Sequence, residues 1–345
     1  MRSFLKPAAG LTCLFALTVT GCSSSSDDTS DAAPEATQQT STAPSESASS
    51  TPSSTTSYAP YVSVTTAADM DDSGSPTAYN LAFAIADGST CTPKWNGTTA
   101  IDNAAVKSRI AALKTSGATV RVSFGGASGK ELATTCTSAT ALAKAYGEAL
   151  DAAGSTQADF DIEGDTLTDS TSVALRSKAI ALLQKERTDL KVSFTLPVMP
   201  SGLDSDSLAL LESANDNAVA VSTVNIMTMN YGESYTADVG DYAITSATAT
   251  HTQLKKVFGL SDAGAWQGMA LTSMIGVNDV SGETFSLADA AQVRTFAEEK
   301  QIAWVSMWST FRDQQCESGS SNDDAATDCS GVTQSSGAFA KAFAG

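Results

Sequence analysis

Three carboxylic acids alternate in one short segment of the chain, Asp159-Phe160-Asp161-Ile162-Glu163. Side chains two residues apart on a β-strand point to the same face, so the acids would share one face and the two apolar residues the other. Burial and mutual repulsion both raise the proton affinity of crowded carboxyls. This pattern is typical of acid–base catalysis, in which one carboxyl stays protonated until it donates to a leaving oxygen.

Glu163 is the expected proton donor because it is the last of the three acids and the nearest to the open end of the strand. Alternating carboxylates can also chelate calcium or magnesium, although such a site needs more oxygen ligands nearby. A solvated strand edge is the structural alternative. The chain has a single histidine, His251, and none of its cysteine spacings matches a zinc motif, so we expect no metal and no cofactor.

Short apolar or β-branched runs alternate with alanine-rich stretches of helical spacing. The runs predict strands near residues 59–65, 79–86, 118–124, 158–163, 191–197, 221–230, 268–276 and 302–308. The stretches between them predict helices at residues 103–115, 137–152, 171–187, 204–213, 250–258 and 286–299. Strands that alternate with helices pair in parallel, because only a long crossover returns the chain in the same direction. We therefore expect an α/β fold, a single (β/α)₈ TIM barrel with its active site at the carboxyl ends of the strands.

Further motifs stand at the ends of other predicted strands. They are Ser123-Phe124-Gly125-Gly126 at the third, Met229-Asn230-Tyr231 at the sixth, Met274-Ile275-Gly276 at the seventh and Trp308 at the eighth, with Tyr61 in the first. Together with the three acids, these residues resemble the DxDxE, SxGG and M-x-Y motifs of the chitinases of glycoside hydrolase family 18. The resemblance covers about residues 58–345, and the closest likeness is to secreted actinobacterial chitinases.

The resemblance implies hydrolysis of β-1,4 bonds between N-acetylglucosamine units, in chitin or its oligosaccharides. Glu163 would protonate the glycosidic oxygen and then act as a base toward water. Asp161 would hold the acetamido nitrogen of the substrate, and Asp159 and Ser123 would share the charge or proton of Asp161. The acetamido oxygen of the substrate would be the nucleophile, so the anomeric configuration would be retained.

The same resemblance assigns the remaining side chains of the site. Tyr231 would donate a hydrogen bond to the acetamido oxygen, and Trp308 would stack beneath the sugar ring. The residues expected to line the substrate site are Ser123, Gly125, Gly126, Met229, Asn230, Trp308 and Tyr61. Only about 30 residues separate the seventh and eighth strands, so the small α+β insertion of some relatives is missing, which predicts an open groove suited to cleavage within a chain.

Three positions depart from the family pattern. Thr156 and Gln157 stand where relatives usually carry Asp-Gly, and Asn230 stands where close relatives carry Asp. None of these changes removes a catalytic group, but Asn230 bears on substrate contacts and on the pH optimum. Two alternative functions share the motifs: an endo-β-N-acetylglucosaminidase acting on glycoprotein glycans, and a chitin-binding protein without turnover. The presence of Glu163 disfavours the second.

The N-terminal residues predict export. A basic start and an apolar run near residues 8–19, too short to span a bilayer, indicate a signal peptide over residues 1–21. Val19-Thr20-Gly21-Cys22 resembles a bacterial lipobox, so we expect lipidation of Cys22, with an ordinary secretory signal as the alternative. Residues 22–57 predict a disordered Ser/Thr/Pro-rich tether and residues 58–345 the catalytic domain. The domain would be anchored by lipid on the outer face of the bacterial membrane, or secreted.

Charge and cysteine content agree with an exported enzyme. The chain has 20 Lys and Arg residues against 38 Asp and Glu residues, a net charge of −18 that repels nucleic acid but not a neutral polysaccharide. We expect a monomer. Four cysteines in the exported domain, Cys91, Cys136, Cys316 and Cys329, predict two disulfides. Of three possible pairings we favour Cys91–Cys136 and Cys316–Cys329, because each closes a loop on one side of the fold.

Overall fold

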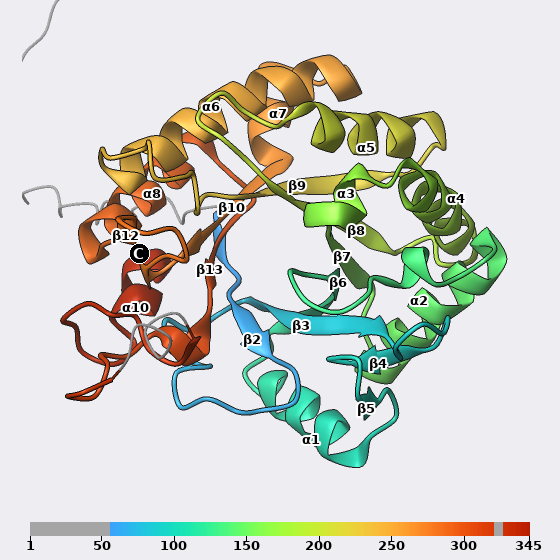
Figure 1. Ribbon diagram of the computed structural model, residues 1–345, viewed down its shortest axis with the longest axis horizontal. Helices are drawn as coiled ribbons and strands as arrows, with labels where there is room; N and C mark the ends of the chain where they lie inside the picture. Colours follow the sequence, from blue (N-terminus) through green and yellow to red (C-terminus); the bar gives the residue numbers. More distant parts are fainter. Residues whose placement is uncertain (1–55, 321–326) are drawn as a thin grey trace, which may run out of the picture. The chain divides into compact units, whose positions relative to one another are not determined.

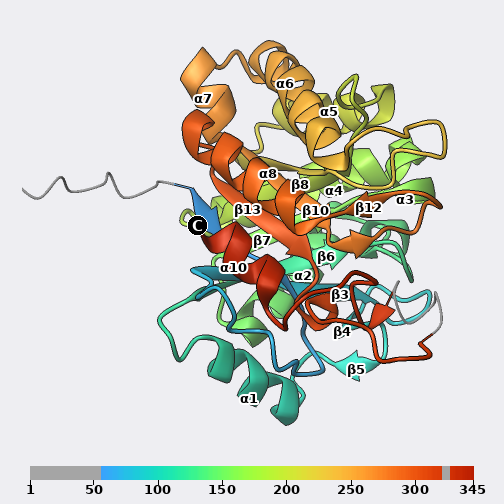
Figure 2. The ribbon, with the colours of Figure 1, turned by 90° about the vertical axis from the view of Figure 1, so that its left-hand side faces the viewer.

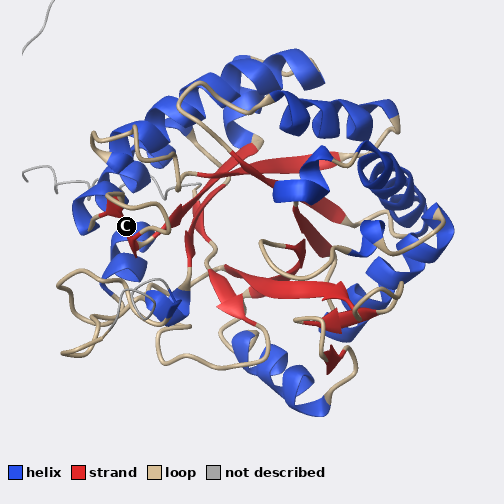
Figure 3. Ribbon diagram, viewed as in Figure 1, coloured by secondary structure: helices blue, strands red, loops and turns tan. Residues whose placement is uncertain are grey.

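Strands form a closed ring at the centre of the domain and helices surround it (Figures 1 and 3). The computed structural model describes residues 56–320 and 327–345. The expected signal peptide, Cys22 and the tether as far as residue 55 lie outside the described residues. Across the two described ranges, no helix combines the length and apolarity needed to cross a bilayer.

The barrel strands follow one another in chain order and pair in parallel. They are β1 (Ser57–Tyr58) together with β2 (Tyr61–Ser63), then β3 (Ala78–Ala86), β6 (Thr119–Gly125), β7 (Gln157–Asp161), β8 (Lys191–Pro197), β9 (Val221–Met227), β10 (Met269–Met274) and β13 (Trp304–Trp308). The predicted (β/α)₈ barrel is confirmed. Strand β1 begins at Ser57, the last residue of the expected tether.

The first strand closes the barrel by pairing on both sides. Ser57 pairs with Trp304 of β13, and Tyr61 pairs with Asn80 of β3. Pro60 lies between the two halves of this strand, β1 and β2, because proline has no backbone N–H to donate to a ladder. Closure therefore joins residues near the start of the domain to residues near its end.

The helices lie outside the strands. They are α1 (Ala104–Leu113), α2 (Ala139–Ala153), α3 (Gly164–Thr168), α4 (Ser170–Glu186), α5 (Ser205–Asp216), α6 (Val239–Phe258), α7 (Asp262–Gln267), α8 (Leu287–Lys300) and α10 (Ala338–Ala344), with 3₁₀ turns η1 (Leu132–Thr134) and η2 (Thr310–Arg312). Helices α8 and α10 pack against each other and against β13 (Figure 2). The helix predicted over residues 250–258 is only the second half of α6, whose first turn is capped by Asp238.

Two small additions decorate the barrel. β4 (Pro93–Trp95) and β5 (Thr99–Ala100) extend the sheet from β3 in antiparallel pairing. β11 (Gly276–Val277) and β12 (Thr284–Phe285) form a hairpin after β10. This hairpin and α8 make up the connection from β10 to β13, so nothing larger rises over that side of the barrel mouth.

Outward packing of three phenylalanines fixes which face of β7 points into the barrel. The ring of Phe160 lies 5.3 Å from Phe124 of β6, 5.6 Å from Phe194 of β8 and 5.0 Å from Tyr146 of α2. These rings are fully buried between the sheet and its helices. Because side chains alternate along a strand, the neighbouring acids of β7 must face the barrel interior.

A buried ion pair supports the rim between β6 and α4. Arg176 Nη2 donates to Glu131 Oε2 at 2.6 Å, and the two side chains are only 1% and 2% exposed. Tyr146 Oη donates to Glu131 Oε1 at 2.5 Å. Burial lowers the pKa of Arg176, but the charges and hydrogen bonds of Glu131 and Tyr146 together outweigh it, and the net pKa is raised. The pair anchors the loop after β6, which borders the catalytic strand.

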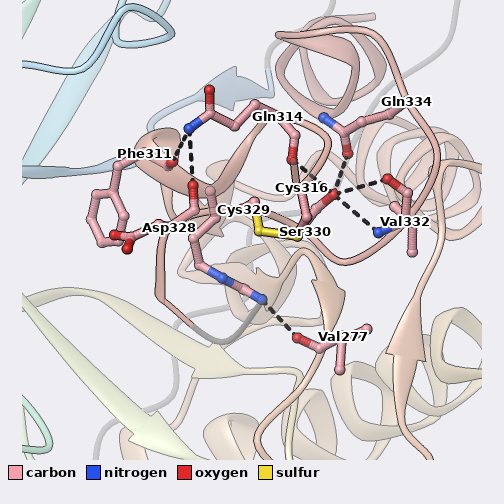
Figure 4. The surroundings of a disulfide bond; sticks show 10 residues. Val277, Phe311, Gln314, Cys316, Asp328, Cys329, Ser330, Val332 and Gln334 are labelled. Carbon is pink, nitrogen blue, oxygen red and sulfur yellow. Dashed lines mark hydrogen bonds between the residues drawn. A yellow bond between two sulfur atoms is a disulfide. The ribbon is translucent and has the colours of Figure 1, made fainter. Parts of the chain in front are cut away.

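Both favoured disulfides, Cys91–Cys136 and Cys316–Cys329, are present. The first joins the turn after β3 to the segment after η1. The second lies in the segment after η2 (Figure 4). Beside it, Gln314 Nε2 donates to the carbonyl of Asp328 at 2.9 Å, and Ser330 Oγ donates to Gln334 Oε1 at 2.8 Å (Figure 4).

Candidate active site

A cleft with a volume of about 640 Å³ opens at the carboxyl ends of the barrel strands. The last residues of β7, β8, β9, β10 and β13 line it, and this is the end of the fold where active sites lie. Acids, aromatic rings and methionines dominate its walls: Asp161, Glu163, Asp204, Asp279, Tyr61, Phe83, Trp308, Met199, Met227, Met229 and Met274.

Asp159 lies below the cleft floor, 1% exposed, with both carboxylate oxygens occupied by hydroxyl donors. Tyr61 Oη and Ser123 Oγ donate to Oδ2 at 3.0 and 2.6 Å. Ser193 Oγ and Thr195 Oγ1 donate to Oδ1 at 2.7 and 2.8 Å. These four donors satisfy both oxygens of the buried side chain and fix its orientation.

A second row of polar side chains orients those hydroxyls. Asn225 Nδ2 donates to Thr195 Oγ1 at 2.9 Å, and Thr272 Oγ1 donates to Asn225 Oδ1 at 2.9 Å. The hydroxyl of Thr195 therefore accepts a hydrogen bond from Asn225 and donates one to Asp159. Because four protein groups already donate to Asp159, its oxygens are not free to bind a metal ion. A metal site built from the three alternating acids would therefore lack one of its ligands. In the described part of the chain, no group of three or more His, Cys, Asp or Glu side chains is arranged to hold a metal ion.

Asp161 is the next inward-facing residue of β7 and borders the cleft. The residue is 6% exposed, and its Oδ1 atom is buried without a hydrogen-bond partner. Burial, Glu163 and Asp159 together raise the pKa of Asp161 well above its ordinary value. A buried carboxyl oxygen without a partner is costly in the free protein, so this atom is available for a group that enters the cleft.

Glu163 lies just beyond the strand, which ends at Asp161 rather than at Glu163 as predicted. Its backbone is still extended, at φ −143° and ψ 172°, so the alternation of the three acids continues. Although Glu163 precedes α3, its side chain makes no capping hydrogen bond and stays available to the cleft. Burial and the nearby charge of Asp279 raise the pKa of Glu163, which favours the protonated form that a general acid requires.

Aromatic rings form one wall of the cleft. Trp308, the last residue of β13, stacks on Phe83 with ring centroids 5.6 Å apart and an interplanar angle of 24°. Tyr61 meets the edge of the same indole at 5.8 Å. Trp308 is only partly buried, so its ring is available for stacking on a sugar.

The glycines and Ser123 shape the site without lining it. A Cβ at Gly125 would lie 2.1 Å from the carbonyl oxygen of Asp161, and one at Gly126 would lie 2.9 Å from the ring of Phe83. These two positions also have positive φ angles of 100° and 87°. Glycine is therefore required at 125 for the close approach of β6 to β7 and at 126 for the ring of Phe83 from β3. Ser123 is fully buried on Asp159.

Tyr231 does not reach the cleft, which corrects the role expected for it. The residue is 3% exposed, and its hydroxyl lies 3.5 Å from Ser246 Oγ of α6. Its ring packs against Tyr235 and Tyr242, at 6.1 and 5.5 Å. The physical reason is that β9 ends at Met227, and the loop then turns Met229 and Asn230 toward the cleft and Tyr231 toward α6. A hydrogen bond from Tyr231 to an acetamido oxygen does not fit this placement.

Gln157, one of the departures from the family pattern, has a local partner away from the chemistry. Its Oε1 accepts from Arg121 Nη2 at 3.0 Å, and its Nε2 donates to Thr119 Oγ1 at 3.1 Å. The guanidinium of Arg121 also lies 4.0 Å from the ring centroid of Trp304. These residues begin their strands, so Gln157 belongs to the amino end of the barrel. Thr156 is exposed, and only its backbone carbonyl is used, by Lys191 N–H.

Sequence reasoning missed Phe83 and Asp279. Phe83 is the only partly exposed residue of β3, and an aromatic residue near the carboxyl end of a predicted strand was a usable signal. Asp279 follows the seventh strand in Gly276-Val277-Asn278-Asp279, an acid at a strand end of the kind that the fold uses for function.

Comparisons with known proteins agree with this geometry. No protein-family model matches the chain. The chain is 34% identical over 275 residues to the probable bifunctional chitinase/lysozyme of Escherichia coli strain K12, and 33% identical over 276 residues to Endochitinase 11 of Metarhizium anisopliae. Each match covers 74% of this chain but only 31% and 52% of the two relatives, respectively, so the chain corresponds to part of each.

A solved structure supports the same relationship over nearly its full length. The catalytic domain of a hyperthermophilic chitinase from Pyrococcus furiosus superposes with a TM-score of 0.74 at 29% identity, covering 83% of this chain and 93% of that domain. Catalytic-site mutants of active domain 2 of a thermostable chitinase from Pyrococcus furiosus, in complex with chito-oligosaccharides, superpose with a TM-score of 0.73 at 29% identity. The alternating acids at the end of the fourth barrel strand and these matches together show that the chain belongs to glycoside hydrolase family 18.

Proposed function

We propose that the protein is a chitinase that hydrolyses β-1,4 bonds between N-acetylglucosamine units by a retaining, substrate-assisted mechanism. The observation that carries the proposal is Asp161, which lines the cleft together with Glu163 and has a buried Oδ1 without a hydrogen-bond partner. An acetamido N–H of the substrate would supply the missing donor. A glucose polymer lacks that group and would leave the atom unsatisfied.

The chemistry follows from the three acids. Glu163 donates its proton to the glycosidic oxygen as the bond to the anomeric carbon breaks. The acetamido oxygen of the same sugar attacks that carbon, while Asp161 accepts the acetamido N–H and supports the charge that develops on the ring so formed. Water then attacks the anomeric carbon, Glu163 takes a proton from the water, and the two inversions give net retention. Asp159, fixed by four hydroxyl donors, stays beneath Asp161 throughout and contacts no substrate atom.

Cleavage within a polymer chain is supported by the shape of the barrel mouth. Only the β11–β12 hairpin and α8 follow β10 before β13, so no larger subdomain stands beside the aromatic wall. The stacked pair of Trp308 and Phe83 gives a sugar chain a flat surface beside the acids. We propose endo-acting hydrolysis on this basis.

Export is part of the proposal. Two disulfides within the domain support an oxidising location outside the cytoplasm. The lipobox-like sequence ending at Cys22 supports attachment to the outer face of a bacterial membrane, and it agrees with the likeness to secreted actinobacterial enzymes. The anchor, the tether and a monomeric state remain predictions from the sequence.

A substrate panel tests the function. Chitin oligosaccharides, a high-mannose glycoprotein and cellulose oligosaccharides are incubated with the wild type and with Glu163→Gln, which keeps the shape of the side chain but has no proton to donate. We expect cleavage of the chitin oligosaccharides alone, a loss of roughly 10²–10⁴-fold in kcat for Glu163→Gln, and β-configured product by NMR of a fresh digest. Cleavage of the glycoprotein alone would indicate the glycan-directed enzyme. An initial α anomer would contradict the substrate-assisted mechanism.

A further inference from the structure

Asn230 and Asp279 form a pair between adjacent loops at the mouth of the barrel, in the cleft that contains Glu163. Asn230 lies in the loop after β9, and Asp279 lies in the β11–β12 hairpin. Asn230 Nδ2 donates to Asp279 Oδ2 at 3.2 Å. In return, Asn230 Oδ1 accepts the backbone N–H groups of Asp279 and Val280 at 3.1 and 3.3 Å. Both side chains line the cleft that contains Glu163.

The two loops are also joined by hydrogen bonds that do not involve this side-chain pair. The backbone N–H of Asn230 donates to Asn278 Oδ1 at 3.4 Å, and Gly232 N–H donates to Glu283 Oε1 at 2.7 Å. Asn230 adopts a positive φ of 55°, a conformation that asparagine tolerates better than most residues. The hairpin is therefore held against the loop at several points, and the position of Asp279 is defined by its neighbours.

We propose that Asp279, held in place by Asn230, is a positioning residue that keeps Glu163 in its proton-donating form. The proposal rests on the proposed function of Glu163 as the general acid. Asp279 is exposed to solvent, and no described cation lies within salt-bridge distance of it. Its negative charge acts on Arg312, which it favours in the charged form, and on the cleft, where it opposes ionisation of Glu163.

The other described charged groups near Glu163 and Asp279 are Asp161, Asp204 and Arg312. Asp161 lines the cleft with Glu163, and in this pair it is the pKa of Asp161 that the charge of Glu163 raises. Asp204, also in the cleft lining, caps α5 by accepting from Ser207 N–H. Arg312, beneath the hairpin, donates to the carbonyls of Val277 and Trp308 at 2.7 and 3.3 Å. Burial and the charge of Asp279 raise the pKa of Glu163.

The pairing also gives a reason for asparagine at position 230. An aspartate there could still accept the two backbone N–H groups, but it could not donate to Asp279. As a carboxylate it would instead repel Asp279 from hydrogen-bond distance. Asn230 thus secures Asp279 and avoids a competing acid beside it.

The test is the pH dependence of kcat on a chitin oligosaccharide. In Asp279→Asn and Asp279→Ser, the midpoint of the alkaline limb should move to lower pH by roughly half to one unit, because Glu163 then ionises more readily. The swap Asn230→Asp/Asp279→Asn restores one carboxylate and one amide to the pair, and it should return the limb toward the wild-type position. Glu212→Gln, which removes an exposed carboxylate from α5, is the matched charge control and should leave the limb unchanged.

Two results would overturn the proposal. One is an alkaline limb that stays in place in both Asp279 variants while kcat falls evenly at all pH values, which indicates a structural role. The other is an equal shift in Glu212→Gln, which indicates a general effect of net charge. Carboxyl titration of Glu163 by NMR, with Glu163→Gln to identify the signal, measures the same shift without substrate. It separates failure of this proposal from failure of the proposed chitinase activity.

Discussion

The buried ion pair beside the catalytic strand offers the sharpest test of how the site is supported. Arg176→Leu removes the cation and leaves the carboxyl of Glu131, which is 2% exposed, with only Tyr146 Oη and Ala133 N–H as donors. Breaking a buried pair by removing one partner costs about 3–5 kcal/mol. For a large single domain each kcal/mol lowers Tm by roughly 2–4 °C, so the variant should melt about 6–20 °C below the wild type.

A second substitution separates the charge effect from lost packing. Two nitrogens of Arg176, Nε and Nη1, are buried without partners, so the pair is not fully satisfied even in the wild type. Arg176→Leu/Glu131→Gln leaves no buried charge and should recover most of the lost stability. Thermal unfolding followed by circular dichroism, repeated in urea, measures all four corners of the cycle. The reasoning would be refuted if the double variant lost as much unfolding free energy as the two single variants added together. It would also be refuted if Arg176→Leu lost less than about 1 kcal/mol.

Three further predictions follow from the acids, the second disulfide and the N-terminus. The pKa of Asp161 is raised in the folded protein, so its contribution to stability is complete below the unfolded value of about 3.9 and is lost as pH rises through the folded value. Between those two pH values, the free energy of unfolding should fall by up to about 1.4 kcal/mol per pH unit. Asp161→Asn should make that fall shallower. The same pH dependence of the urea unfolding midpoint in the wild type and in the variant would contradict this. Replacing Cys316 and Cys329 with serine opens a loop with a sequence separation of 13 and should cost about 3 kcal/mol in the chain-entropy account; unchanged thermal unfolding, or free thiols at both positions in the exported wild type, would contradict it. Cys22→Ser should move the enzyme from the membrane fraction to the medium with kcat unchanged, and equal membrane retention would exclude the lipid as the anchor.

The barrel and its acids were predictable because both depend on simple periodicities. Apolar runs marked each barrel strand, and the alternation in β7 placed Asp159 and Asp161 on the inner face once Phe160 packed outward. Helix α6 was predicted too short because its first half, Val239–Thr248, is rich in small and polar residues. Its start depends on the cap from Asp238 and on burial of positions such as Ala243 and Ala247, which are tertiary effects.

Side-chain direction after the strands was not predictable. Tyr231 follows Asn230 directly, yet the left-handed backbone of Asn230 sends the two residues to opposite sides of the loop. The importance of Asp279 depends on a contact between residues 49 positions apart in the chain. Neither a strand period nor a motif in one segment contains that information, because it arises when two loops meet at the barrel mouth.

The split first strand has a consequence for how the protein folds. Ser57 pairs with Trp304, and Thr56 Oγ1 donates to the carbonyl of Ala297, a residue 241 positions away. Closing a loop of that length costs on the order of 5 kcal/mol in chain entropy, and the ladder contacts that repay it form only when β13 is present. During synthesis or export, β1 is therefore an open edge until almost the whole domain has emerged. A chain cut before Trp304 leaves β1 and β10 without their shared neighbour, and we expect such fragments to aggregate through those edges rather than to persist as a smaller enzyme.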